Sequence, residues 1–148
     1  MDKNRLICHR ANLWGADLNR ENKIVAIKEC IAMGFDVEID LRFYRTKFYL
    51  GHDERQESIP YDLLLKWKKR LWIHCKDLES AHELHGSKLN FFWHDKDPYT
   101  LTSHKHIWTY PNQKVLDSCV IVCQTLEETN KYLKSLAYKI CTDFVVKN

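Results

Sequence analysis

The sequence DVEIDLR (residues 36–42) alternates charged and apolar side chains along its whole length. Successive side chains of a β-strand point to opposite faces, so a strand here would gather Glu38, Asp40 and Arg42 on one face. The solvent-exposed face of an antiparallel strand would show the same pattern. In a parallel sheet both faces are covered, and charged side chains there need a partner because unpaired buried charge is unfavourable.

The sequence LWIHCK (residues 71–76) alternates in the same way. Trp72, His74 and Lys76 would share one face of this second strand. In both stretches the polar side chains gather toward the carboxyl end, which is where α/β proteins place their functional sites. A bound cation together with an anionic substrate would account for charged groups on a covered face.

Strand-like and helix-like segments alternate from one end of the chain to the other, which is typical of parallel βαβ units. The expected strands cover residues 6–9, 35–41, 48–50, 71–75, 89–93, 107–110, 119–123 and 140–142. The expected helices cover residues 21–33, 60–69, 78–85 and 125–136. No repeat, low-complexity segment or linker interrupts them, so we expect a single domain over residues 1–148.

Two architectures fit these elements. Complete (β/α)8 barrels need about 250 residues, so the number of elements alone slightly favours an open doubly wound sheet. The polar strand faces at residues 36–42 and 71–76 favour a barrel. We therefore expect an α/β fold, a compact TIM-like (β/α) barrel with seven to eight mostly parallel strands and reduced helices.

Composition excludes several classes of function. The 148 residues carry 23 Lys and Arg against 20 Asp and Glu, a net charge of +3 that is too small to indicate nucleic-acid binding. No apolar run approaches the roughly 20 residues that cross a bilayer, and residues 1–5 lack the apolar segment of a signal peptide. We therefore expect a soluble cytoplasmic protein without stable membrane insertion, whose six cysteines are free. The oligomeric state stays open.

Three histidines, His9, His52 and His94, lie at or just after the carboxyl ends of expected strands. One such histidine is more often structural than catalytic, but several of them beside Glu38 and Asp40 favour a catalytic site. The two carboxylates are hard oxygen ligands that suit Mg²⁺ or Ca²⁺. Such an ion would stabilise the charge that develops on phosphoryl oxygens. Two histidines could share acid and base duties near neutral pH.

The chain also carries an ordered series of short motifs, which are His9-Arg10, Glu21-Asn22, Glu38-Ile39-Asp40, Gly51-His52-Asp53, a strand that ends in Lys76, and the segment 140–144. Their order and spacing resemble the glycerophosphodiester phosphodiesterase family and, more broadly, the phosphatidylinositol-phospholipase-C-like phosphodiesterases. The resemblance runs from residue 8 to about residue 145. It implies a TIM barrel that hydrolyses a small phosphodiester.

The resemblance also implies roles for single residues. His9 and His52 would be the catalytic acid and base. Substrate would be held by Arg10, Lys76, Arg42 and Trp108, the first two through its phosphate. The metal ligands would be Glu38, Asp40 and His74. The Glu21-Asn22 step would order the first loop and helix rather than touch substrate.

His74 departs from the family pattern, which has an acidic metal ligand at that position. A histidine suits softer metals than Ca²⁺ and removes one negative charge, so Mn²⁺ joins Mg²⁺ and Ca²⁺ as a candidate cofactor. The family's insertions are also missing, so we expect an open, shallow site. Trp93 and Tyr110 would lie in strand-like runs and line either the pocket or the core.

The sequence therefore supports three hypotheses. The leading one is metal-assisted hydrolysis of a glycerophosphodiester or a related small phosphodiester. The second is a non-catalytic barrel that binds a phosphorylated ligand. The third is an open-sheet protein of unrelated function, in which Glu38 and Asp40 would point away from His9 and His52.

Overall fold

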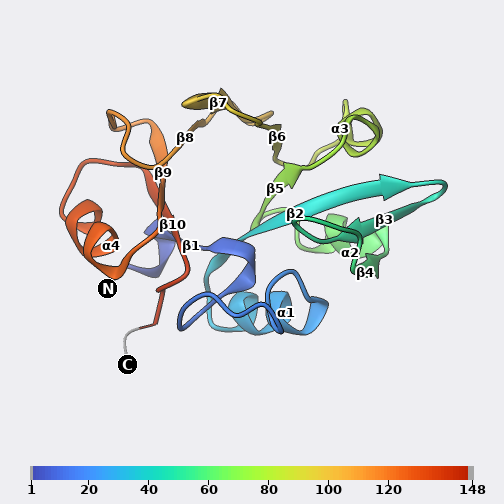
Figure 1. Ribbon diagram of the computed structural model, residues 1–148, viewed down its shortest axis with the longest axis horizontal. Helices are drawn as coiled ribbons and strands as arrows, with labels where there is room; N and C mark the ends of the chain where they lie inside the picture. The colour runs from blue at the N-terminus through green and yellow to red at the C-terminus, as the bar shows by residue number, and fades with distance from the viewer. Residues whose placement is uncertain (1, 147–148) are drawn as a thin grey trace.

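The computed structural model describes residues 2–146, and its strands form one ten-stranded mixed sheet (Figure 1). The strands are β1 (Leu6–Cys8), β2 (Asp36–Tyr44), β3 (Lys47–Leu50), β4 (Glu57–Ile59), β5 (Leu71–Cys75), β6 (Phe91–Trp93), β7 (Tyr99–Leu101), β8 (Ile107–Thr109), β9 (Cys119–Cys123) and β10 (Lys139–Thr142). The helical elements are η1 (Lys3–Arg5), η2 (His9–Ala11), α1 (Ile24–Ala32), α2 (Tyr61–Lys66), α3 (Leu78–Leu84) and α4 (Leu126–Leu133).

The centre of the sheet is a parallel band in the order β6-β5-β2-β1-β10-β9-β8. The long strand β2 also pairs with β3 in an antiparallel hairpin, which turns at Arg45. Strand β4 pairs with β3, and β7 pairs with β8, both antiparallel. Parallel pairing places the carboxyl ends of the central strands at one edge of the band.

The predicted TIM-like barrel was wrong, because the sheet curls into an open half-barrel with few helices. Within residues 2–146, β6 pairs only with β5 and β7 only with β8, so no strand ladder joins the two ends. The ends meet through single hydrogen bonds instead: the Ser103 N–H donates to the Phe91 carbonyl (2.7 Å), and the Thr100 hydroxyl donates to the Trp93 carbonyl (3.0 Å). Strand β7 occupies the edge of β8 that a closed barrel would use.

Helices cover the outer face of this band. In Figure 1, α4 lies beside β9 and β10 on one flank, α1 lies below β2, and α3 lies on the opposite flank. Apolar side chains of α1, including Ile27, pack with Val37 and Ile39 of β2 in the larger of two buried clusters. The burial of these apolar surfaces is the main force that holds the layers together.

A second buried cluster fills the inside of the curl. Its members come from six strands of the parallel band and are Ile7, Trp72, Phe92, Trp108, Val120 and Cys141. Phe92 stacks on Trp108 with ring centroids 4.4 Å apart, and Trp108 lies 6.1 Å from Trp72. This aromatic layer separates the space at the carboxyl ends of the strands from the space at their amino ends.

Two smaller expectations can be checked directly. All six cysteines are buried and free, as predicted. The helix predicted to begin at Glu21 begins instead at Ile24, because Asn22 has a left-handed backbone (φ 55°) that a helix cannot contain. Within the described residues, no helix has the length and apolarity needed to cross a membrane.

Candidate functional site

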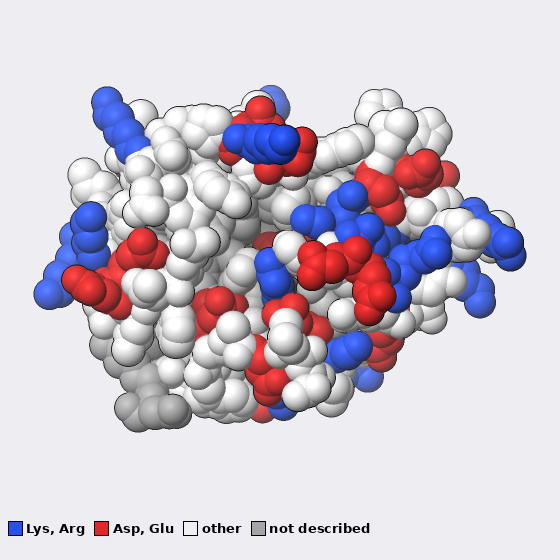
Figure 2. Space-filling view, viewed as in Figure 1, with Lys and Arg blue, Asp and Glu red and all other residues white. Residues whose placement is uncertain are grey.

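A cavity of about 210 Å³ opens at the carboxyl ends of the parallel strands. Figure 2 shows a hollow near the middle of this view, with acidic and basic side chains close together beside it. The residues that line the cavity are His9, Arg10, Glu38, Asp40, His52, His74, Lys76, His94, Asp95, Trp108, Tyr110, Pro111, Val122 and Gln124. Of the nine residues predicted for the site, only Arg42 is missing from this set.

The two carboxylates lie on the inner face of β2, as the alternation in residues 36–42 predicts. Both are buried, Glu38 at 2% and Asp40 at 0% exposure. Burial and the neighbouring charge of Asp40 raise the pKa of Glu38. Burial alone would also raise the pKa of Asp40, but its contacts with His74 and Asn22 hold that pKa well below its ordinary value. Asp40 is therefore charged at neutral pH.

His74 lies next to the carboxylates and completes a group of metal-ligand type. One ligand atom from each of Glu38, Asp40 and His74 lies within 4.8 Å of the other two. The Nε2 atom of His74 is 3.1 Å from the carbonyl oxygen of His94, which can only accept a hydrogen bond. Nε2 therefore carries a proton, and Nδ1 lies 3.4 Å from Asp40 Oδ1. This cluster is able to hold a metal ion.

The loop after β1 brings Arg10 against the carboxylates. Arg10 has a left-handed backbone (φ 51°), which is uncommon for a side chain of this size. This conformation lets its N–H donate to Glu38 Oε2 (2.9 Å) while its Nε lies 3.5 Å from Asp40 Oδ2. Local strain of this kind persists where surrounding contacts impose it.

Asn22 holds this loop in place. Its side-chain amide donates to Asp40 Oδ2 (2.8 Å), and its oxygen accepts from the Asp40 N–H (2.9 Å). The Asn22 N–H also donates to the Arg10 carbonyl (2.8 Å). These contacts agree with the prediction that the Glu21-Asn22 step orders the first loop.

His9 is oriented by a carboxylate that directly follows the last strand, β10. Its Nδ1 donates to Asp143 Oδ1 (3.1 Å), which also accepts from the Asn12 amide (2.8 Å). Burial alone would lower the pKa of His9, but the hydrogen bond to Asp143 and the charge of Glu38 raise it above its ordinary value. The other ring nitrogen, Nε2, is left to act in the cavity.

His52 reaches the same cavity from the loop after β3. Its Nδ1 donates to Asp53 Oδ1 (2.8 Å). Gly51 has φ 147°, and a Cβ there would lie only 1.9 Å from the Glu54 carbonyl oxygen, so this turn requires glycine. Arg42 donates to the carbonyls of Gly51 and His52. It therefore holds the loop and does not contact the cavity, unlike the predicted substrate contact.

Six further residues line the cavity: Val122 in β9, and His94, Asp95, Tyr110, Pro111 and Gln124 just after β6, β8 or β9. Both ring nitrogens of His94 are buried without a hydrogen-bond partner among the described residues. Its ring lies 5.9 Å from His74 and 4.9 Å from Tyr110. His94 is one of the three strand-end histidines of the sequence, and strand parity also places it inward, because it follows the inward-facing Phe92 by two positions.

Comparisons with protein-family models, with curated proteins and with solved structures found no match to this chain. The family resemblance of the motifs therefore stays an expectation. The geometry agrees with one part of the third hypothesis and disagrees with the other. The sheet is open, but Glu38 and Asp40 share their cavity with His9 and His52, whereas the third hypothesis has them pointing apart.

Proposed function

We propose that this chain hydrolyses a glycerophosphodiester or a related small phosphodiester with the help of a divalent metal ion. One observation carries the proposal: three side chains of metal-ligand type, the cations Arg10 and Lys76, and the histidines His9 and His52 all line one cavity. Chain segments far apart in the sequence supply them, namely the strands β2 and β5 and the segments that follow β1, β3 and β5.

Glu38, Asp40 and His74 would hold the ion. Their fit is supported by Asp40 Oδ1, which is buried and has no hydrogen-bond partner among the described residues. It is supported further by His74, whose Nε2 donates to a carbonyl, as metal-ligating histidines commonly do. Two carboxylates suit Mg²⁺ or Ca²⁺, and the imidazole also admits Mn²⁺. When bound, the ion would stabilise negative charge on the phosphoryl oxygens.

The remaining groups bind the phosphate and move protons. Arg10 and Lys76 would hold the phosphoryl oxygens, Arg10 through its planar guanidinium and Lys76 as a point charge. His9 and His52 each engage Nδ1 with a carboxylate, which leaves Nε2 to react. One imidazole would accept a proton from the attacking water molecule as its oxygen bonds to phosphorus, while the other gives a proton to the leaving oxygen as its bond to phosphorus breaks. Trp108 would form the floor beneath them.

The test is hydrolysis of glycerophosphocholine and of bis(p-nitrophenyl) phosphate in the presence of Mg²⁺, Ca²⁺ or Mn²⁺. His9→Ala and His52→Ala should each lower kcat by about 100-fold or more, because positioned acid–base groups contribute at least that much. His82→Ala is the matched control, since His82 is exposed on α3 and does not line the cavity. Full activity in both cavity variants would overturn the assigned roles.

A second candidate function, binding of a phosphorylated ligand without turnover, is favoured by the charge balance of the cavity. Arg10 already lies against Asp40, and His74 stands where the resembling family has a third acid. A phosphate could therefore bind between Arg10 and Lys76 without an ion. Binding of glycerol 3-phosphate with no thermal shift from any of the three metals, and no turnover of either substrate, would favour this function.

A further inference from the structure

A larger cavity, of about 550 Å³, lies at the opposite end of the sheet. Its lining comes from the amino ends of the parallel strands: Asp36 begins β2, Lys139 begins β10, and Trp72 is the second residue of β5. Asn90 and His106 directly precede β6 and β8. The aromatic layer inside the curl separates this cavity from the one that holds Glu38 and Asp40. Its volume is in the range of small-molecule sites, about 300–1,000 Å³.

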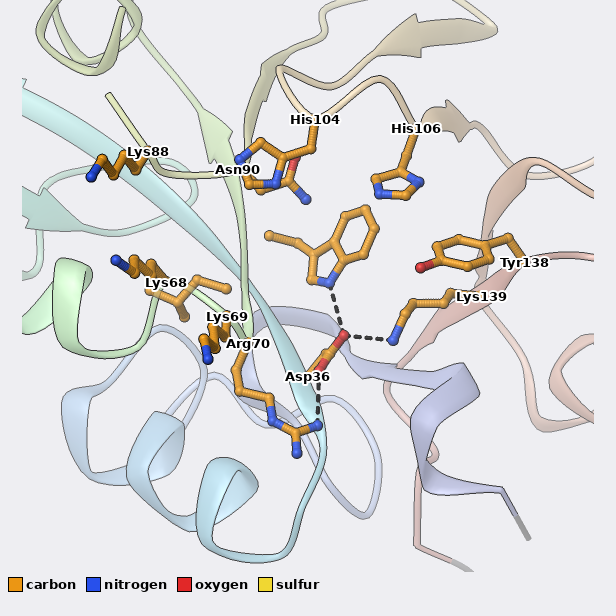
Figure 3. A pocket seen from close by; sticks show the side chains of 12 residues that line it. Asp36, Lys68, Lys69, Arg70, Lys88, Asn90, His104, His106, Tyr138 and Lys139 are labelled. Carbon is orange, nitrogen blue, oxygen red and sulfur yellow. Dashed lines mark hydrogen bonds and ion pairs between the residues drawn. The ribbon is translucent and has the colours of Figure 1, made fainter. Parts of the chain in front are cut away.

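The cavity carries a strong excess of positive charge. Its described lining holds five basic side chains against one carboxylate, a net formal charge of +4, and the basic ones are Lys68, Lys69, Arg70, Lys88 and Lys139. Figure 3 shows Lys68, Lys69, Arg70 and Lys88 on one side of the cavity, with Lys139 and Asp36 facing them.

The single carboxylate is already saturated by its neighbours. Asp36 accepts from Lys139 Nζ (2.6 Å) and from an Arg70 guanidinium nitrogen (3.1 Å). It also accepts from the indole N–H of Trp72 (3.1 Å). Asp36 therefore fixes two of the cations in place but neutralises only one charge, and Lys68, Lys69 and Lys88 are exposed around it.

A buried polar group and an aromatic wall complete the cavity. Asn90 is only 5% exposed, and its side-chain oxygen has no hydrogen-bond partner among the described residues. This oxygen only accepts hydrogen bonds, so a hydroxyl or N–H group of a ligand, such as the hydroxyl of a protonated phosphoryl group, would satisfy it. On the other side, His106 stacks on Tyr138 with centroids 4.8 Å apart and lies 5.1 Å from Trp72.

We infer that this cavity is a second binding site, which takes a small anion that carries a phosphoryl group. A phosphoryl group offers two negative charges and three acceptor oxygens, so it can engage several ammonium groups at once. A monocarboxylate would neutralise only one of them. The inference does not depend on catalysis at the other end of the sheet, because the two cavities share no residue.

Calorimetric titration with pyrophosphate tests the site. The titration is done in a Lys76→Ala background, which removes a predicted phosphate contact from the first cavity. In that background, the triple change Lys68→Ala, Lys69→Ala and Lys88→Ala should raise the Kd about tenfold or more, because hydrogen bonds to charged groups are lost. The matched control changes three exposed lysines that lie elsewhere, namely Lys28, Lys114 and Lys134, to alanine.

The control removes the same net charge and should leave the Kd within about twofold, because none of these three side chains lines the cavity. Equal weakening in both triple variants, or no binding of pyrophosphate before the triple change, would overturn the site. Asn90→Asp offers a second test, since a carboxylate next to the ligand should repel it. If this variant binds pyrophosphate with an unchanged Kd and has an unchanged unfolding temperature, Asn90 does not contact the ligand. The buried part of the cavity would then not belong to the site.

Three further probes identify the ligand chemistry. Methyl phosphate and AMP both carry a phosphoryl group, and tighter binding of AMP would add the aromatic wall of His106 and Tyr138 to the site. Citrate carries comparable charge on carboxylates. Binding of citrate more tightly than pyrophosphate would overturn the assignment to phosphoryl anions.

Discussion

The outer face of β2 and β5 is apolar throughout, whereas the inner face of the same two strands carries Glu38, Asp40 and His74. On the outer face, side chains such as Ile39 are buried under helices and contribute stability. On the inner face, polar groups lie at both ends of the strands with aromatic rings between them. One set of strands thus supplies a stabilising face and a face whose polar groups are costly to bury without partners.

Loss of outer-face packing should have the largest effect on stability. Ile39 is fully buried in the larger cluster, so Ile39→Ala should lower the free energy of unfolding by about 2–5 kcal/mol through the lost contacts and the cavity left behind. Urea denaturation measures this. Val25→Ala is the control, because Val25 is 71% exposed on α1 and should change stability by less than about 0.5 kcal/mol. A similar effect from both variants would contradict the division of roles between the faces.

On the inner face, stability should depend on metal instead. A divalent ion that binds only the folded chain stabilises it by about 2.7 kcal/mol at a concentration 100 times its Kd. Asp40→Asn should abolish this gain, because it removes a charged ligand atom from the cluster. Differential scanning fluorimetry with and without Mn²⁺ measures the shift. Asp117→Asn, at an exposed position, is the control, and equal shifts in the two variants would exclude Asp40 as a ligand.

Strand parity explains how much of the site the sequence could predict. Alternation in residues 36–42 and 71–76 places Glu38, Asp40 and His74 on one side, and the structure has them there. The same rule would place His94 and Tyr110 inward, two positions after Phe92 and Trp108. Arg42 also has the inward parity, but its position beyond the end of the cavity leaves it to bond the loop after β3.

The fold class could not be predicted because closure of a barrel depends on contacts between distant strands. Strands β4 and β7, both of three residues, were missed, since such short edge strands form through pairing rather than through their own pattern. Strand β7 folds back on β8 and occupies the edge of β8 at which another parallel strand would pair in a closed barrel. Likewise, the left-handed backbone at Arg10 and Asn22 follows from their bonds to the buried carboxylates, which lie outside any local pattern.

A substitution in the turn that carries His52 should have a smaller effect on stability, and it should also lower activity. Gly51→Ala would push a Cβ against the Glu54 carbonyl, so we expect a loss of about 1–3 kcal/mol from backbone strain, together with reduced hydrolysis. Gly86→Ala is the matched control, because Gly86 also has positive φ (76°) but a Cβ there meets nothing within 4 Å. Urea denaturation and the phosphodiesterase assay measure both variants. Loss of activity in Gly86→Ala as well would indicate a general effect of destabilisation.

The smallest expected effect is electrostatic and concerns the pair His9 and Asp143. Because the folded pKa of His9 is raised above its ordinary 6.5, this group stabilises the fold fully below pH 6.5, and the contribution is lost as pH rises through the raised pKa. Asp143→Asn removes the carboxylate, so the pKa of His9 should fall, as a histidine NMR titration would show. The difference in unfolding free energy between wild type and Asp143→Asn should then shrink between pH 5.5 and pH 8.5. A comparison of the two proteins cancels the contributions of the other histidines. An unchanged pKa of His9 in the variant would mean that Asp143 orients the ring without supporting its charge.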